Sequence, residues 1–122
     1  MIPQTGITFD AQAIRVIDGD TIEVETRLVH RIRLKDCWCK ETSLRQGQTE
    51  LEKRQGLLAK QYMEDLLAEK DNKVRVFIPG NGGDLSHLSN MGRVIGQMWR
   101  PHDARDLSTK MVNAGHATRK KQ

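Results

Sequence analysis

Apolar and polar residues alternate along the first third of the chain in the manner of β-strands. Residues 12–18, QAIRVID, are rich in β-branched types, and residues 21–26, TIEVET, alternate strictly. The stretch Asp18-Gly19-Asp20 between them is a turn signal. Residues 29–34, VHRIRL, alternate again with one slip in phase, which indicates a bulge or a twist. We therefore predict three strands joined as an antiparallel meander.

A helix is predicted after a polar loop. Residues 40–53, KETSLRQGQTELEK, show no regular period and are predicted to form the loop. Residues 54–70 carry apolar residues at helical spacing, with Lys, Gln and Glu between them. The face that packs on the core is predicted to consist of Leu57, Leu58, Tyr62, Leu66 and Leu67.

Two further strands and a short helix complete the predicted order. Residues 73–78, KVRVFI, and residues 92–99, GRVIGQMW, are strand-like, and each stretch is followed closely by a proline. Residues 106–114 have an apolar side suited to a short helix, which Gly115 would cap.

This order of elements predicts a mainly β protein with a small closed sheet. A five-stranded barrel of the OB kind with one helix between its third and fourth strands fits the order, and a second helix lies near the C-terminus. A split α+β sandwich is the alternative on pattern alone. At 122 residues the chain is predicted to be one domain, with a core over about residues 12–117 and a basic tail at 118–122.

Composition narrows the class of protein only slightly. Twenty basic and sixteen acidic residues give a net charge of +4, which is compatible with a polyanionic partner but does not require one. No transmembrane run is present, and the N-terminus lacks the basic start and apolar middle of a signal peptide, so a cytoplasmic protein is expected. Cys37 and Cys39 are predicted to be free thiols, because a disulfide across one residue is strained and no second cysteine pair completes a zinc site.

Several short stretches, in order along the chain, resemble the staphylococcal nuclease family. They are VIDGDTIEV at 16–24, RIRL at 31–34 followed by Glu41-Thr42, GR at 92–93, DL at 106–107 and MVNAGHA at 111–117. The resemblance covers roughly residues 12–117. It implies an OB barrel with flanking helices and calcium-assisted hydrolysis of phosphodiester bonds in DNA or RNA.

The resemblance also implies roles for particular residues. Asp20 falls on the carboxylate ligand of calcium, and Glu41 falls on the glutamate that activates or orients the attacking water. Arg33 and Arg93 fall on the two arginines that bind phosphate. These residue types suit the reaction, since calcium prefers oxygen ligands, arginine grips phosphate oxygens and a carboxylate can accept a proton from water. Asp18 is interpreted as a residue that stabilises the turn.

The segment after the third strand departs from the family pattern. Trp38 stands where the family has its second calcium-binding aspartate, and an indole cannot bind calcium. Asp36, two residues earlier, is the candidate replacement ligand. Trp38 itself is a candidate for stacking on a nucleobase. Lys120 and Lys121 in the tail are candidates for non-specific contacts with phosphate.

The expected function is therefore that of a nuclease that uses calcium or another divalent cation. Its expected substrate is DNA or RNA that is single-stranded or frayed, with activity weakened by the tryptophan at position 38. The alternative is an OB barrel that binds nucleic acid without cleaving it and needs no metal. A third possibility is a protein-interaction domain. The sequence leaves the choice between DNA and RNA, the oligomeric state and the biological process open.

Overall fold

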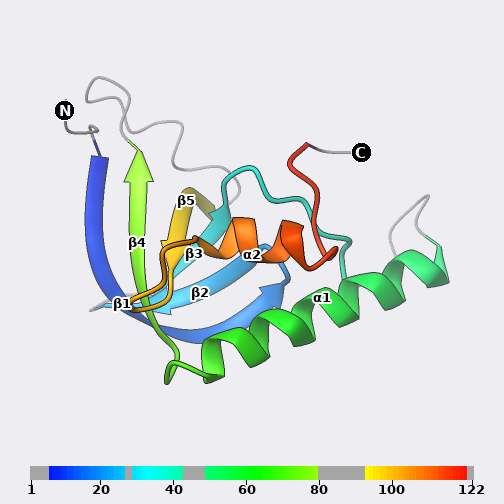
Figure 1. The fold of residues 1–122 in the computed structure, drawn as a ribbon, viewed down its shortest axis with the longest axis horizontal. Helices are drawn as coiled ribbons and strands as arrows, with labels where there is room; N and C mark the ends of the chain where they lie inside the picture. Colours follow the sequence, from blue (N-terminus) through cyan, green and yellow to red (C-terminus); the bar gives the residue numbers. More distant parts are fainter. Residues whose placement is uncertain (1–5, 27–28, 43–48, 80–92, 121–122) are drawn as a thin grey trace.

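The protein folds as a closed barrel of five strands with two helices outside it. A computed structural model describes residues 6–26, 29–42, 49–79 and 93–120, and for Arg93 the backbone alone. The elements are β1 (Gly6–Asp18), β2 (Thr21–Glu25), β3 (Val29–Leu34), α1 (Glu50–Ala68), β4 (Lys73–Pro79), β5 (Arg93–Trp99) and α2 (Leu107–Asn113). The strand order around the barrel is β1-β2-β3-β5-β4 (Figure 1). The predicted mainly β class with a closed five-stranded sheet is confirmed.

Strand β1 is long enough to pair with two neighbours. Its N-terminal half pairs antiparallel with β4 and its C-terminal half with β2, and two shifts of register bend it between these partners. The predicted first strand, residues 12–18, was therefore too short, because residues 6–11 become a strand by pairing with β4. The predicted irregularity of the third strand was misplaced, since β2 and β3 pair without a shift of register.

The barrel interior is filled by side chains that alternate with outward-facing ones along each strand. The fully buried strand residues are Ile22, Val24, Ile32, Leu34, Val76 and Met98. Helix α1 runs along the β1 side of the barrel, and α2 crosses in front of the barrel in the view of Figure 1. Leu107 and Met111 of α2 are fully buried in the same core. No described helix is long and apolar enough to cross a membrane.

Helix α1 begins earlier than predicted and buries only part of the predicted face: Tyr62, Leu66 and Leu67 pack on the core as predicted. Thr49 caps it through a capping box with Glu52, so the helix starts at Glu50 within the predicted loop. Its buried residues are Gly56, Ala59, Met63 and Leu67. Leu57 and Leu58, which were predicted to pack on the core, are 46% and 58% exposed. The prediction was wrong here because the helix lies so close to neighbouring backbone that small residues occupy part of the contact.

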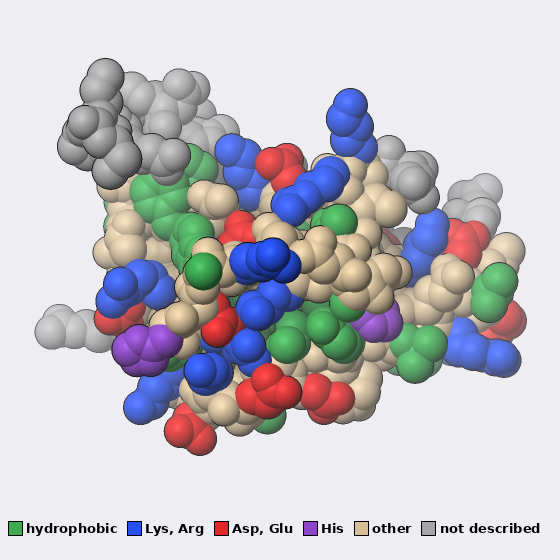
Figure 2. Space-filling view, viewed as in Figure 1, with side chains coloured by type: hydrophobic (Ala, Val, Ile, Leu, Met, Phe, Trp, Pro, Cys, Tyr) green, Lys and Arg blue, Asp and Glu red, His purple; other side chains and the backbone are tan. Residues whose placement is uncertain are grey.

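Charged side chains around α2 pair with one another. Figure 2 shows basic side chains gathered over α2 and the segment before it, with acidic side chains between them. Arg100 follows β5, is 8% exposed, and donates to Asp103 and Glu69 at 2.6 Å each. It also donates to the Leu66 carbonyl at 2.9 Å, and Lys110 lies 3.5 Å from Asp103. Arg100 therefore ties the C-terminal end of α1 to the segment that leads into α2.

Candidate functional site

Asp20 lies at the turn between β1 and β2 and is only 7% exposed. Its Oδ2 accepts a hydrogen bond from the Cys39 backbone N–H at 3.0 Å, although the two residues are 19 positions apart. Its Oδ1 accepts from the Thr21 hydroxyl at 3.2 Å. Burial raises the pKa of Asp20, and the charge of Asp18 adds to the rise, while the Cys39 N–H and Arg33 act to lower it. The surroundings of this carboxylate thus offset only part of the cost of burying its charge.

Arg33 is brought to Asp20 by the pairing of two strands. Position 33 of β3 lies opposite Thr21 of β2, and the inward-facing neighbours Ile32 and Leu34 leave Arg33 on the outer face of the barrel. Its Nη2 is 3.9 Å from Asp20 Oδ2, at the outer limit of an ion pair. Its Cζ lies 3.7 Å from the centroid of the Trp38 ring. The indole therefore orients the guanidinium through its face, and stacking leaves the edge of the guanidinium to present its N–H donors.

The backbone of Trp38 is hydrogen-bonded to the C-terminal segment. Its backbone N–H donates to the Thr118 carbonyl at 2.9 Å, and its carbonyl accepts from the Thr118 N–H at 3.0 Å. The ring face turned toward Arg33 is covered by the guanidinium, so a nucleobase cannot use that face. Orientation of Arg33 is accordingly the role that the contacts of Trp38 support most directly.

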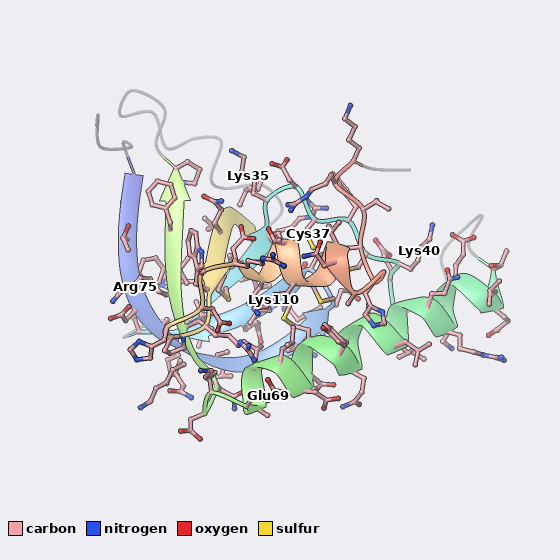
Figure 3. The ribbon with its side chains drawn as sticks, in the orientation of Figure 1. Lys35, Cys37, Lys40, Glu69, Arg75 and Lys110 are labelled. Carbon is pink, nitrogen blue, oxygen red and sulfur yellow. The ribbon has the colours of Figure 1, made fainter. Side chains whose placement is uncertain are left out.

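Glu41 lies on the segment that follows β3, and Lys35, Cys37 and Lys40 mark the course of this segment in Figure 3. Thr42 next to it donates from its N–H and hydroxyl to Asp18 Oδ1, at 3.2 and 3.0 Å. One carboxylate oxygen of Glu41, Oε2, is withdrawn from solvent. Asp18 was interpreted from the sequence as a stabiliser of its own turn, whereas the hydrogen bonds of its side chain in the structure hold the segment that carries Glu41. No pattern in the sequence indicated that contact.

Helix α1 supports the same segment at Gly56. A Cβ built on Gly56 would overlap the carbonyl oxygen of Glu41 and lie 2.7 Å from that of Lys40. Gly19, in the turn before Asp20, lies against the same helix, where an added Cβ would lie 2.9 Å from the Ala59 Cβ. The helix thus approaches both the Asp20 turn and the Glu41 segment closely, and glycine permits the approach.

Replacing Gly56 with alanine is expected to destabilise the protein by about 2 kcal/mol, because the clash is with backbone that cannot rotate away. On an exposed helix the same change would stabilise by about 1 kcal/mol. Chemical denaturation checks the prediction, with Gln55→Ala on the exposed side of the same turn as the control. A more stable Gly56→Ala protein would contradict the close approach of α1 to Glu41.

The remaining predicted site residues are placed as follows. Arg93 begins β5 with its backbone in register with Arg31 of the parallel strand β3, and its side chain lies outside what the structure describes. Asp36 is exposed, in the turn after β3, with a left-handed φ of 53°. The Asp20 side chain forms its hydrogen bonds and ion pair with Thr21, Cys39 and Arg33, and among the described residues none of these interactions involves Asp36. Lys120 is exposed, and Lys121 lies outside the described residues.

The two cysteines are free thiols, as predicted. Cys37, the residue before Trp38, is fully buried, and Cys39, the residue after it, is partly buried. A hydrogen bond with Cys37, burial and the charges of Asp20 and Asp18 raise the pKa of the Cys39 thiol far above its usual range. A thiol that stays protonated is a poor nucleophile, so the contribution of Cys39 to the site is its backbone N–H.

Asp18 and Asp20, the two carboxylates of the β1–β2 turn, have the negative charge that a divalent cation requires, but they supply few ligands. Within the described residues no group of three or more His, Cys, Asp or Glu side chains gathers as a metal site. Burial and the charge of Asp18 nevertheless raise the pKa of Asp20, so a cation beside Asp20 would relieve both effects. This donor set fits a hydrated cation that is shared with a bound phosphate, as magnesium often is, better than a fully caged calcium ion.

The fold and the site together define an OB-like barrel that presents a desolvated carboxylate and an oriented guanidinium on its outer face. A scan against protein-family models finds no match for the chain, and a search of curated proteins finds none either.

Proposed function

We propose that the protein is a nuclease that hydrolyses phosphodiester bonds of DNA or RNA on an OB barrel of the staphylococcal nuclease type. One observation carries the proposal. Asp20 and Arg33, which the pairing of β2 with β3 brings together, lie 3.9 Å apart, and the guanidinium is oriented by an aromatic ring. The element order, with α1 between β3 and β4 and α2 after β5, also supports the family resemblance.

In the proposed reaction the edge of the Arg33 guanidinium donates to the non-bridging oxygens of the scissile phosphate. The donation strengthens as negative charge grows on those oxygens in the transition state. Glu41 accepts a proton from the attacking water, whose oxygen bonds to phosphorus as the bond to the leaving oxygen breaks. The leaving oxygen departs with the bonding electron pair and takes a proton from solvent. Arg93 is proposed as the second phosphate-binding arginine. A divalent cation shared by Asp20 and the phosphate would supply additional neutralisation of charge.

The test is cleavage of DNA and RNA oligonucleotides with calcium, magnesium, manganese or chelator. Asp20→Asn keeps the shape of the side chain and removes its charge, so it is expected to raise the cation concentration for half-maximal cleavage by roughly 10–100-fold. Asp10→Asn, an exposed carboxylate of β1 that pairs with Arg75, is the control and should leave the cation dependence unchanged. Cleavage by the wild type with no response to Asp20→Asn would contradict the assigned role of Asp20.

The second candidate function is a nucleic-acid-binding module without catalytic activity. It is favoured by Trp38, which occupies the position of the family's second carboxylate and engages Arg33 instead. In that case wild-type protein binds oligonucleotides with a steep dependence on salt and cleaves none of them with any cation. Absence of both binding and cleavage would favour the protein-interaction domain.

A further inference from the structure

A concave feature lies where β2 ends and β3 and β5 begin, next to the candidate site along β3. It has a volume of about 340 Å³ and is lined by Glu23, Val29, His30, Arg31 and Val94. A cavity of this size falls within the range of small-ligand sites. None of these residues belongs to the group formed by Asp20, Arg33 and Trp38.

Arg31 connects this pocket to the candidate site along one strand. Arg31 and Arg33 lie two positions apart on β3, opposite Glu23 and Thr21, so both project from the outer face of the barrel. Two residues of a strand span about 6.6 Å. That distance is comparable with the separation of neighbouring phosphates in a nucleic acid strand.

Glu23 holds Arg31 in the pocket wall while leaving the surface positive. Arg31 Nε donates to Glu23 Oε2 at 3.0 Å, and Arg15 Nη1 lies 3.8 Å from the other carboxylate oxygen. The Glu23 side chain is 14% exposed, whereas those of Arg31 and Arg15 are 49% and 64% exposed. Two guanidinium groups therefore share one recessed carboxylate, and the net charge of the three side chains is positive.

The rest of the pocket wall is less polar. Val29 is 50% exposed and shares the outer face of β3 with Arg31, whereas His30 and Val94 are half-buried and lie opposite the core residues Val24 and Ile32. The Arg31 guanidinium beside the apolar Val29 side chain matches a nucleotide, which combines an anionic phosphate with a flat apolar base.

We propose that this pocket is a subsite for the nucleotide next to the scissile phosphate on the same strand. Arg31 binds that nucleotide's phosphate, and the base packs on Val29. The proposal rests on the proposed nuclease function and specifies its substrate class: a polynucleotide strand rather than an ester of a single nucleotide.

The test compares two substrates, a nucleoside p-nitrophenyl phosphate, which reaches only the scissile site, and an oligonucleotide of about ten nucleotides. Arg31→Gln is expected to raise KM for the oligonucleotide about tenfold, to lower the salt dependence of binding by about one phosphate contact, and to leave kcat unchanged. KM for the nucleoside ester should not change. Val29→Ala should raise KM for the oligonucleotide without altering the salt dependence.

Arg15→Gln is the matched control, because Arg15 pairs with the same carboxylate but does not line the pocket. Equal effects of Arg15→Gln and Arg31→Gln, or an equal effect of Arg31→Gln on both substrates, would overturn the subsite. Thermal unfolding of each variant verifies the fold. If the wild type cleaves neither substrate, the nuclease proposal fails. Oligonucleotide affinity of the two arginine variants, measured by fluorescence anisotropy, then decides the subsite separately: weaker binding by Arg31→Gln alone supports it, and equal binding overturns it.

Discussion

Arg33→Lys is expected to lower kcat for oligonucleotide cleavage by about 100- to 1000-fold, the range for removing one donor to a developing anion. Lysine keeps the positive charge but loses the planar guanidinium that lies 3.7 Å from the Trp38 ring. Without that stack the charge is no longer oriented toward the phosphate. Steady-state kinetics at saturating cation checks the prediction through the change in kcat.

Arg75→Lys is the matched control for this substitution. Arg75 lies on β4, at the opposite end of the molecule from Lys40 in Figure 3, and forms an exposed ion pair with Asp10 at 2.8 Å. The Arg75→Lys protein should have the same kcat for oligonucleotide cleavage as the wild type, because Arg75 is not part of the candidate site. An Arg33→Lys protein that keeps more than about a tenth of wild-type kcat would remove Arg33 from the mechanism.

Arg100→Met is expected to lower the free energy of unfolding by about 3 kcal/mol, because it removes one partner of a recessed ion pair and leaves the other charged. Methionine has similar length and keeps the packing of the aliphatic stem. Arg100 donates to Asp103, Glu69 and the Leu66 carbonyl, so its loss also disconnects α1 from the approach to α2. A fall in melting temperature of about 10 °C would accompany this loss. Urea denaturation measures the free energy directly.

The dependence of this effect on pH provides a second readout. Burial alone would raise the pKa of Asp103, but the hydrogen bond and charge of Arg100, together with Lys110, outweigh burial and lower it. A lowered carboxylate pKa contributes stability at neutral pH, and the contribution is lost as the pH falls through that pKa. The wild type should therefore lose its advantage over Arg100→Met on acidification. Arg75→Met, at an exposed pair that solvent screens, should differ little from the wild type at neutral pH and so leave little difference to lose on acidification. A constant difference between wild type and Arg100→Met would contradict the assignment.

Local patterns in the sequence were sufficient to predict much of the barrel. Strict alternation predicted β2 and β3 closely, since alternate positions of a strand with one buried face must be apolar. The Asp18-Gly19-Asp20 turn was likewise predicted from residue types alone. The prediction that Asp20 and Arg33 are site residues rested on the family resemblance and not on these patterns.

Other features depend on contacts between segments distant in the chain. Residues 6–11 become strand because β4 lies beside them, and α1 buries Gly56 and Ala59 rather than Leu57 and Leu58 because other backbone lies against it. The stacking of Arg33 on Trp38 and the Cys39 hydrogen bond to Asp20 have no signature in residue spacing.

The sequence by itself thus determined the periodic elements and the residue types available for chemistry, because periodicity is a property of neighbouring residues. The tertiary structure alone decided which faces are buried and which charged groups meet. Burial and electrostatic coupling depend on distances in space, and those distances are set when the barrel closes and the helices pack against it.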